Sequence, residues 1–274
     1  MNNGRVTGDP DRRFGRARRW CTASGGCHHR GMSREPIPSA AYVEMPPPPA
    51  LRDRVRRVWH YRASASAAAP LVLPDGCVDL IWDGAQLFVA GPDQQAMTAQ
   101  LAPDARLTGL RLSPGVAHRL LGTPMHWLAD RRVAADTIIG PRAGLLARRL
   151  SDGGDPAETL LAAVGEVPVQ PDPRMAWLFA QLHGMDAPRV PDLARQLGIS
   201  ERSLHRHCLE AFGYGPKVLD RVLRLQRLLC LAPRAATLTR AALDAGYADA
   251  THLSHDVRRL TGLTPTALLR DHGH

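Results

Sequence analysis

The chain has 274 residues and a formal net charge of +9, a length that allows two domains with a hydrophobic core each. Its five cysteines show no framework spacing, and no apolar run approaches the roughly 18 residues of a membrane span. These features exclude a disulfide-stabilised secreted protein and a transmembrane protein, and we expect a cytoplasmic one. Eight arginines and two aspartates in the first 34 residues supply +6 of the net charge. Most of the positive net charge of the chain therefore comes from the N-terminal segment.

Residues 1–40 are rich in Gly, Arg, Ser and Pro and show no hydrophobic periodicity. We expect a disordered basic tail that adds only non-specific phosphate contacts. Two cysteines and an adjacent histidine pair lie here, but the second spaced pair that a tetrahedral zinc site needs is missing. We predict no metal. A translation start at Met32 or Met45 would also explain the unusual composition.

Residues 41–165 alternate short apolar runs with turn residues. A Pro-Asp-Gly turn at 74–76 precedes a predicted strand over residues 77–82. Two further strands are predicted over 87–90 and 107–112. An amphipathic element over 51–61 and helices near 116–121 and 142–150 complete this half. We expect a small β-rich domain with helical additions.

Residues 166–173 are proline-rich and read as a linker. Asp172 and Pro173 are good residues to begin a helix, which we expect to reach about Leu182. The periodicity from there onward is helical throughout. We therefore place an all-α C-terminal domain at residues 174–272.

Two short helices are predicted around Gly198. Pro191 suits the first turn of the first helix, and Gly198 ends it because glycine adopts a positive φ at no steric cost. Ser200 is a good N-cap for the second helix, in which Leu204 and Cys208 face the first. This pattern is typical of a helix-turn-helix, although an ordinary helical hairpin has similar features.

The pattern occurs a second time, which argues against the ordinary hairpin. Ala242 and Gly246 repeat Ala194 and Gly198 at a common offset of 48 residues. Asp249 takes the place of the N-cap. An internal repeat is much more specific than a single copy. We therefore predict two helix-turn-helix units joined by one long helix over residues 216–231.

Roughly the last hundred residues resemble the DNA-binding region of the AraC/XylS family of bacterial transcription regulators. The positions that carry the resemblance are Leu193-Ala194, Gly198, Ser200, Leu204-His205-Arg206, Phe212-Gly213, Pro216-Lys217, Arg224-Leu225, Leu228-Leu229, Ala242, Gly246-Tyr247 and Gly262-Leu263-Thr264-Pro265. Cys208, Leu253 and Val257 stand where the family usually has phenylalanine, so the core of each unit is lighter.

The N-terminal half resembles an uncharacterised domain that precedes this DNA-binding region in some AraC-type regulators. The similarity rests on the order of residues 73–80, Gly91-Pro92, the segment 109–115 and Leu121-Gly122. In the wider family this module is often a cupin-like effector or dimerisation domain. The resemblance thus implies an α+β protein whose N-terminal domain is β-rich and cupin-like.

The second helix of such a unit enters the major groove, where its outward side chains reach base edges. The candidate base contacts are Arg202, His205, Arg206, Thr251, Ser254 and His255. The candidate phosphate contacts are Ser200, Lys217, Asp249, Arg258 and Arg259. Only the arginines of the first unit can bond guanine bidentately. We expect the first unit to set base preference and the second to hold register, about 34 Å away if the connecting helix is rigid. Asp256 is expected to repel phosphate.

No nucleophile elbow, phosphate loop or dinucleotide fingerprint occurs, so we predict no enzyme, no catalytic residue and no cofactor. Cys77 lies between Asp75 and Asp79, whose charges disfavour a thiolate. Cys208 and Cys230 are expected on apolar helix faces. If the N-terminal domain binds an effector, its candidate contacts are Trp59, Cys77, Asp79 and Trp82. These residues fit a core and dimer interface better, because core positions outnumber pocket positions in a domain of this size.

The sequence therefore predicts a DNA-binding transcription regulator whose partner is double-stranded DNA. RNA polymerase, a small-molecule effector and a second copy of the chain remain open as further partners. The alternative is a protein-interaction or effector-binding module with only weak, non-specific DNA binding.

Overall fold

A computed structural model describes residues 41–64 and 69–272. The predicted basic tail of residues 1–40 lies outside this range. Among the described residues, no helix combines the length and hydropathy that crossing a bilayer requires.

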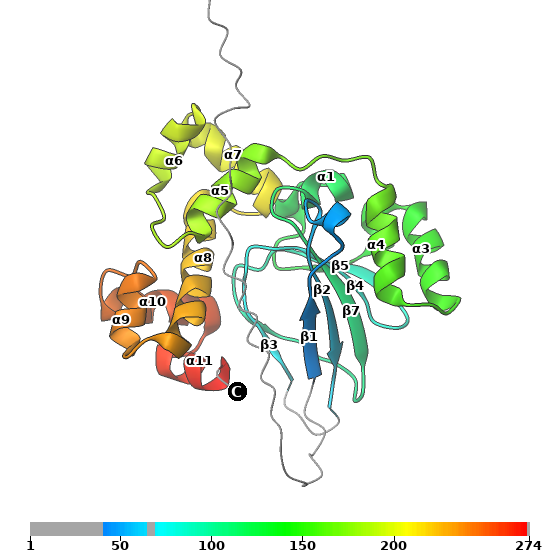
Figure 1. Cartoon of the computed structure of the whole chain (residues 1–274), viewed down its shortest axis with the longest axis horizontal. Helices are drawn as coiled ribbons and strands as arrows, with labels where there is room; N and C mark the ends of the chain where they lie inside the picture. The colour runs from blue at the N-terminus through cyan, green and yellow to red at the C-terminus, as the bar shows by residue number, and fades with distance from the viewer. Residues whose placement is uncertain (1–40, 65–68, 273–274) are drawn as a thin grey trace, which may run out of the picture. The chain divides into compact units, whose positions relative to one another are not determined.

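The first half is built on a six-stranded antiparallel sheet with the order β1-β2-β7-β4-β5-β8 (Figure 1). Its strands in this order are Ala41–Met45, Val55–Arg62, Arg106–Leu112, Asp79–Trp82, Leu87–Ala90 and Arg132–Ala134. The short strands β3 (Leu71–Val72) and β6 (Met97–Thr98) form a separate pair. The strands predicted from the sequence are present. β4 begins two residues later than expected, although the Val78 carbonyl still accepts a hydrogen bond from the Leu112 N–H at 2.9 Å.

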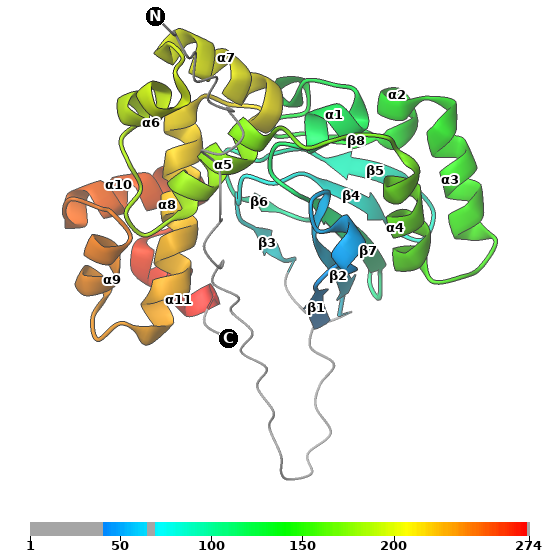
Figure 2. The ribbon, with the colours of Figure 1, turned by 45° about the horizontal axis from the view of Figure 1, so that its top comes forward.

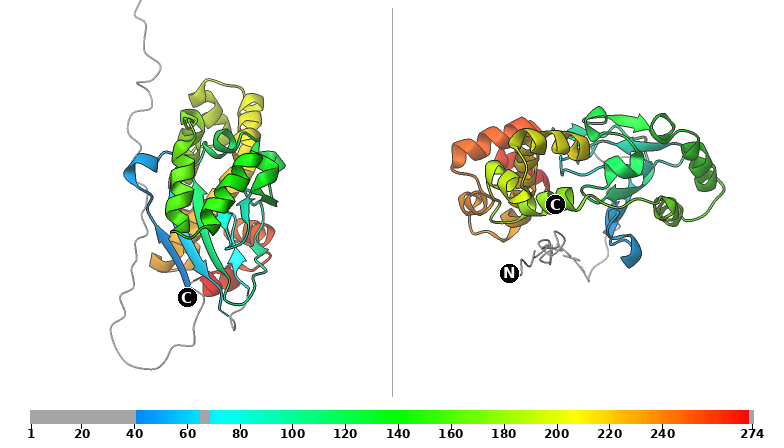
Figure 3. Two further views of the ribbon diagram at one scale, coloured as in Figure 1. Left: turned by 90° about the vertical axis from the view of Figure 1, so that its right-hand side faces the viewer. Right: turned by 90° about the horizontal axis from the view of Figure 1, so that it is seen from above.

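Helices cover one face of the sheet, as Figure 1 and Figure 3 show. They are α1 (Ala117–Leu121), α2 (Ala135–Ile139), α3 (Pro141–Ser151) and α4 (Pro156–Glu166), with 3-10 turns η2 at Pro49–Leu51 and η3 at Met125–Trp127. Because side chains alternate along a strand, Leu80 and Trp82 pack under these helices. Ile81 points to the opposite face, where it packs with Trp59. The two faces therefore carry separate hydrophobic clusters.

The opposite face depends on one glycine. Gly109 in β7 pairs with Trp59 in β2, and a Cβ at this position would lie 2.2 Å from the indole ring. Only glycine lets the ring lie across the neighbouring strand.

The second half is helical (Figure 2). Its helices are α5 (Pro173–His183), α6 (Val190–Leu197), α7 (Glu201–Phe212), α8 (Pro216–Leu231), α9 (Leu238–Asp244), α10 (Ala250–Thr261) and α11 (Pro265–His272), with the 3-10 turn η4 at Ala232–Arg234. Leu219 and Leu223 of α8 pack with α5, α6 and α7. Val222 and Leu225 pack with α9 and α10. Residues of α8 therefore belong to two hydrophobic cores, one in each helix-turn-helix unit. The predicted α+β class, with two units joined by a long helix, is confirmed.

Candidate nucleic-acid interface

The turn of the first unit forms as its residue types require. Gly198 has a φ of +68° and ends α6, and the N–H of Ile199 bonds the carbonyl of Ala194 at 3.1 Å. The Ser200 hydroxyl then accepts a hydrogen bond from the Ser203 N–H at 3.1 Å and so caps α7. Leu204 is fully buried under α6.

The second unit repeats this geometry. Gly246 has a φ of +93°, and the N–H of Tyr247 bonds the carbonyl of Ala242 at 3.0 Å, as Ile199 does in the first unit. The Asp249 carboxylate accepts a hydrogen bond from the His252 N–H at 2.7 Å and caps α10. Both predicted caps and the predicted repeat are present.

The second helix of the first unit, α7, presents the predicted base contacts to solvent. Arg202, His205 and Arg206 are all exposed. Arg206 donates one bond, to the Ser203 hydroxyl at 3.5 Å. The ring of His205 lies against the start of α8, since a Cβ on Gly215 would come within 2.5 Å of it. The arginines therefore extend outward, whereas the histidine is held close to the backbone.

The second helix of the second unit, α10, gathers its predicted contacts on one face. A surface recess of about 490 Å³ is lined by Thr251, Ser254, His255, Arg258 and Arg259. Their spacing of three, four, seven and eight residues places them on one side of a helix. Along α10, Thr251, Ser254 and His255 come first, and Arg258 and Arg259 follow in its last turn. Lys217, at the start of α8, is exposed as well.

The expectation that Asp256 repels phosphate is wrong. Only 6 % of its side chain is exposed, and it accepts ion pairs from Arg221 at 3.3 Å and Arg224 at 3.5 Å. Its charge is thus compensated inside the domain. Sequence reasoning missed this cluster because the two arginines are more than thirty residues away and an aspartate on a helix usually faces water.

The predicted effector residues do not come together in one site. Trp59 and Trp82 are buried on opposite faces of the sheet. Asp79 pairs with Arg111 at 3.3 Å, and Cys77 packs among the helices of the first unit. Burial and the charge of Asp75 raise the pKa of the Cys77 thiol to about 12, so this thiol is not reactive at neutral pH.

Burial also raises the pKa of the Cys208 thiol to about 12. Cys230, by contrast, is exposed. The expectation that it lies on an apolar face was wrong, because it stands near the end of α8 outside the clusters of buried residues.

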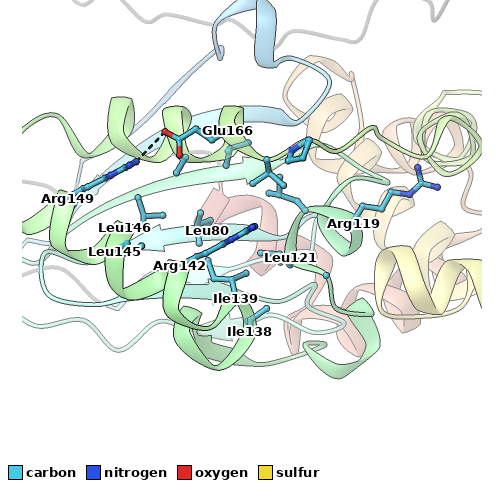
Figure 4. A pocket seen from close by; sticks show the side chains of 16 residues that line it. Leu80, Arg119, Leu121, Ile138, Ile139, Arg142, Leu145, Leu146, Arg149 and Glu166 are labelled. Carbon is cyan, nitrogen blue, oxygen red and sulfur yellow. Dashed lines mark hydrogen bonds and ion pairs between the residues drawn. The ribbon is translucent and has the colours of Figure 1, made fainter.

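A cavity that the sequence did not indicate lies on the helix-covered side of the sheet (Figure 4). It has a volume of about 630 Å³ and is lined from α1, the end of α2, α3, α4 and β4. None of the four predicted effector residues lines it. Its walls come from five separate segments, and no local sequence pattern marks such a site.

Comparison with known families agrees with this geometry. Residues 193–271 match a family described as a helix-turn-helix domain, and they contain both turns and the helices α7 and α10. The second half of the chain therefore carries an AraC-type helix-turn-helix domain, which supports a DNA-binding transcription regulator. In the first half of the regulator, residues 43–134 match a domain of unknown function, DUF6597. No curated protein matches the chain in sequence.

Solved structures similar to the regulator include ToxT from Vibrio cholerae O395. One ToxT structure shares 12% identity, covers 77% of this chain and 96% of its own, and has a TM-score of 0.41. A second, bound to (E)-4-(8-methylnaphthalen-1-yl)but-3-enoic acid, shares 12% identity, covers 85% and 98%, and has a TM-score of 0.39. The likeness is too distant to assign residues.

Proposed function

We propose that the regulator reads DNA sequence through α7 and holds its register on the duplex through α10. The observation that carries this proposal is the different chemistry of the two exposed faces. Arg202 and Arg206 project from α7, and a guanidinium bonds guanine O6 and N7 bidentately. The corresponding part of α10 offers Thr251, Ser254 and His255, which lack such a fork.

The phosphate contacts are proposed at helix ends. Ser200 and Asp249 cap α7 and α10, whose first turns retain N–H groups that attract phosphate. Lys217, Arg258 and Arg259 add exposed positive charge. Contacts of this kind orient a protein on DNA without reading its sequence.

The connecting helix supports a fixed spacing between the two reading helices. Arg227 of α8 is buried and donates to the Ala245 carbonyl at 3.0 Å and to the Leu182 carbonyl. One side chain therefore ties α8 to both α5 and the turn of the second unit. We expect the two units to bind successive major grooves, about 34 Å apart.

Residues 41–165 are proposed to sense an effector or to dimerise, and residues 174–272 to bind DNA. RNA polymerase is a further proposed partner. The buried position of Cys77 against α5 and α8 supports coupling between these regions, because rearranging the N-terminal half near Cys77 would disturb the core of the first unit.

The test is selection of binding sites from a random DNA pool by the full chain, at several stated salt concentrations. The proposal predicts one enriched motif, read by α7, within a site long enough for α10 to contact the duplex about one helical turn away. It also predicts an affinity that falls as salt rises, because phosphate contacts release counterions. Salt-dependent binding without any enriched motif would contradict sequence reading and favour the weak, non-specific alternative.

A further inference from the structure

The segment 73–77 of the N-terminal half contacts the cores of both helix-turn-helix units. Cys77, at one end of it, is buried in the core of the first unit. Leu73, at the other end, packs against the core of the second unit. Residues four positions apart in a chain lie within about 14 Å of each other. The segment therefore runs beside α8, whose residues belong to the same two cores.

The turn inside this segment fits closely against α5 and α8. Gly76 has a φ of +78°, and a Cβ at this position would lie 3.0 Å from the Phe179 ring and 3.3 Å from Leu219. Both the positive φ and the close approach require glycine. The Pro74 carbonyl accepts a hydrogen bond from the side-chain amide of Gln226, on α8, at 2.8 Å. The segment is thus held to the connecting helix by a hydrogen bond as well as by packing.

Asp75, at the centre of the turn, joins the segment to the sheet. Its carboxylate accepts a hydrogen bond from the Cys77 N–H at 2.9 Å and pairs with Arg111 of β7 at 3.0 Å. Arg111 also pairs with Glu44 of β1 at 2.8 Å and with Asp79 of β4 at 3.3 Å. The side chains of Arg111 and Asp75 are 23% and 26% exposed, so water and salt screen this ion pair less than a surface pair. Three strands of the sheet therefore fix the position of the turn.

A second contact from the same region reaches α10. Strand β3, which directly precedes Leu73, pairs with β6. Ala96 directly precedes β6, and its N–H donates a hydrogen bond to the Leu260 carbonyl in the last turn of α10 at 2.6 Å. The carbonyls of a last helical turn have no partner within their own helix. This bond therefore adds a fixed point on the second unit that α8 does not provide.

We propose that residues 73–77 complete the DNA-binding domain of the regulator, and that Asp75 is a positioning residue that fixes the distance between its two helix-turn-helix units. The segment forms a second connection beside α8, and two parallel connections restrict bending and twisting of one unit against the other. Units held at the right distance lose less conformational freedom when they bind. The inference rests on the proposed function, because a fixed distance matters only if α7 and α10 contact one duplex.

The test measures the distance between the two units in the full chain without DNA, by double electron–electron resonance between two spin labels. The labels are attached at Gln196→Cys on α6 and Leu243→Cys on α9, which are exposed positions. The remaining cysteines Cys77 and Cys208 are buried. The background removes the other three cysteines through Cys21→Ser, Cys27→Ser and Cys230→Ser.

Two variants weaken the segment from opposite sides. Asp75→Asn removes the charge that pairs with Arg111. Gln226→Ala removes the hydrogen bond to the Pro74 carbonyl from the side of α8. The matched control is Asp104→Asn, which removes the aspartate charge of an exposed ion pair in the same half of the chain. Circular dichroism checks that every variant is folded, and if Asp75→Asn is not, Gln226→Ala decides.

The parent chain is expected to give one narrow distribution of distances. Asp75→Asn and Gln226→Ala should at least double its width, and Asp104→Asn should leave it unchanged. On the DNA site that the parent chain selects, the same two variants should bind at least fivefold more weakly, about 1 kcal/mol, with the motif unchanged because α7 is intact.

The proposal is overturned if a folded variant keeps the narrow distribution, if Asp104→Asn broadens it equally, or if affinity is unchanged although the distribution is broader. The distances are measured without DNA. A DNA selection that yields no motif would therefore count against the proposed function and leave the result on the two units standing.

Discussion

Nε of Arg221, on the connecting helix α8, lies 3.3 Å from Oδ1 of Asp256 in α10, the second helix of the second unit. Arg224, one turn further along α8, approaches the other carboxylate oxygen at 3.5 Å. Together they fix the rotation of α10 about its own axis. That rotation decides that Thr251 and His255 face outward.

The first prediction concerns this buried carboxylate. Asp256→Ala should lower the free energy of unfolding by about 2–3 kcal/mol, because in a poorly hydrated site it removes the carboxylate partner of Arg221 and leaves Arg224 with Asp220 alone. Urea unfolding at neutral pH measures the change. Asp244→Ala is the control, since its pair with Arg240 is exposed and should contribute less than about 1 kcal/mol. Equal effects of the two substitutions would show that burial of the pair is unimportant.

The second prediction concerns the helix cap at Ser200. Ser200→Ala should destabilise the chain by about 1 kcal/mol, whereas Ser200→Gly should remove only a few tenths. The hydroxyl accepts from the Ser203 N–H, and alanine leaves that N–H unpaired. Thermal unfolding measures both. Ser151→Ala serves as control because its hydroxyl bonds only the Ala147 carbonyl within its own helix. A loss at Ser151 as large as that at Ser200 would refute the cap.

The third prediction is a dependence of stability on pH. Burial, with the nearby charges of Arg56 and Arg227, lowers the pKa of His183 to about 4, compared with an ordinary value of about 6.5. The folded state therefore favours the neutral ring, which stacks on Phe179 with centroids 6.0 Å apart. Its contribution to stability is complete above pH 6.5 and is lost as the pH falls towards 4, because the unfolded chain takes up the proton first.

The expected loss from His183 over this window is about 2 kcal/mol, after allowance for partial exposure. Denaturant unfolding at a series of pH values measures it. Because burial also lowers the pKa of His118, the informative quantity is the difference between the wild type and His183→Gln. That difference should be flat above pH 6.5 and shrink below it. A constant difference at all pH values would contradict the assignment.

The fourth prediction concerns thiol reactivity. In a Cys21→Ser, Cys27→Ser background, one thiol should react rapidly with a thiol reagent at neutral pH, and Cys230→Ser should remove that reaction. Cys77 and Cys208 are buried and their pKa is raised to about 12, so they should react only on unfolding. Rapid reaction of two or more thiols would contradict their burial in the core.

Features that depend on residues close together in the sequence could be predicted, and features that depend on residues far apart in the sequence could not. Gly198, Ser200 and Asp249 were predictable because a turn or a cap is determined by residues three or four positions away. The strands followed from apolar runs between turn residues. Asp256 was misjudged because its two arginine partners lie on another helix. The cavity on the helix-covered side of the sheet was missed because its walls come from five segments that only the tertiary fold brings together.

The effector candidates show the same limit. Trp59 and Trp82 were grouped by residue type, yet alternation along paired strands places them on opposite faces of the sheet. The pairing register of strands β2 and β4, which carry the two tryptophans, could not be predicted from a single sequence. The predicted grouping of these residues into one pocket is therefore wrong, because the structure places Trp59, Trp82 and Cys77 in three separate clusters.

The most direct test of the central claim is to repeat the DNA selection with Arg206→Ala beside the wild type. Arg195→Ala is the control, because this exposed arginine lies on α6 and pairs with Asp192 at 3.0 Å. We predict that Arg206→Ala relaxes the motif at one base pair, a loss of about 1–3 kcal/mol of discrimination, and that Arg195→Ala keeps the motif. A uniform fall in affinity with the motif intact would show that Arg206 contacts phosphate, and that α7 does not read sequence through it.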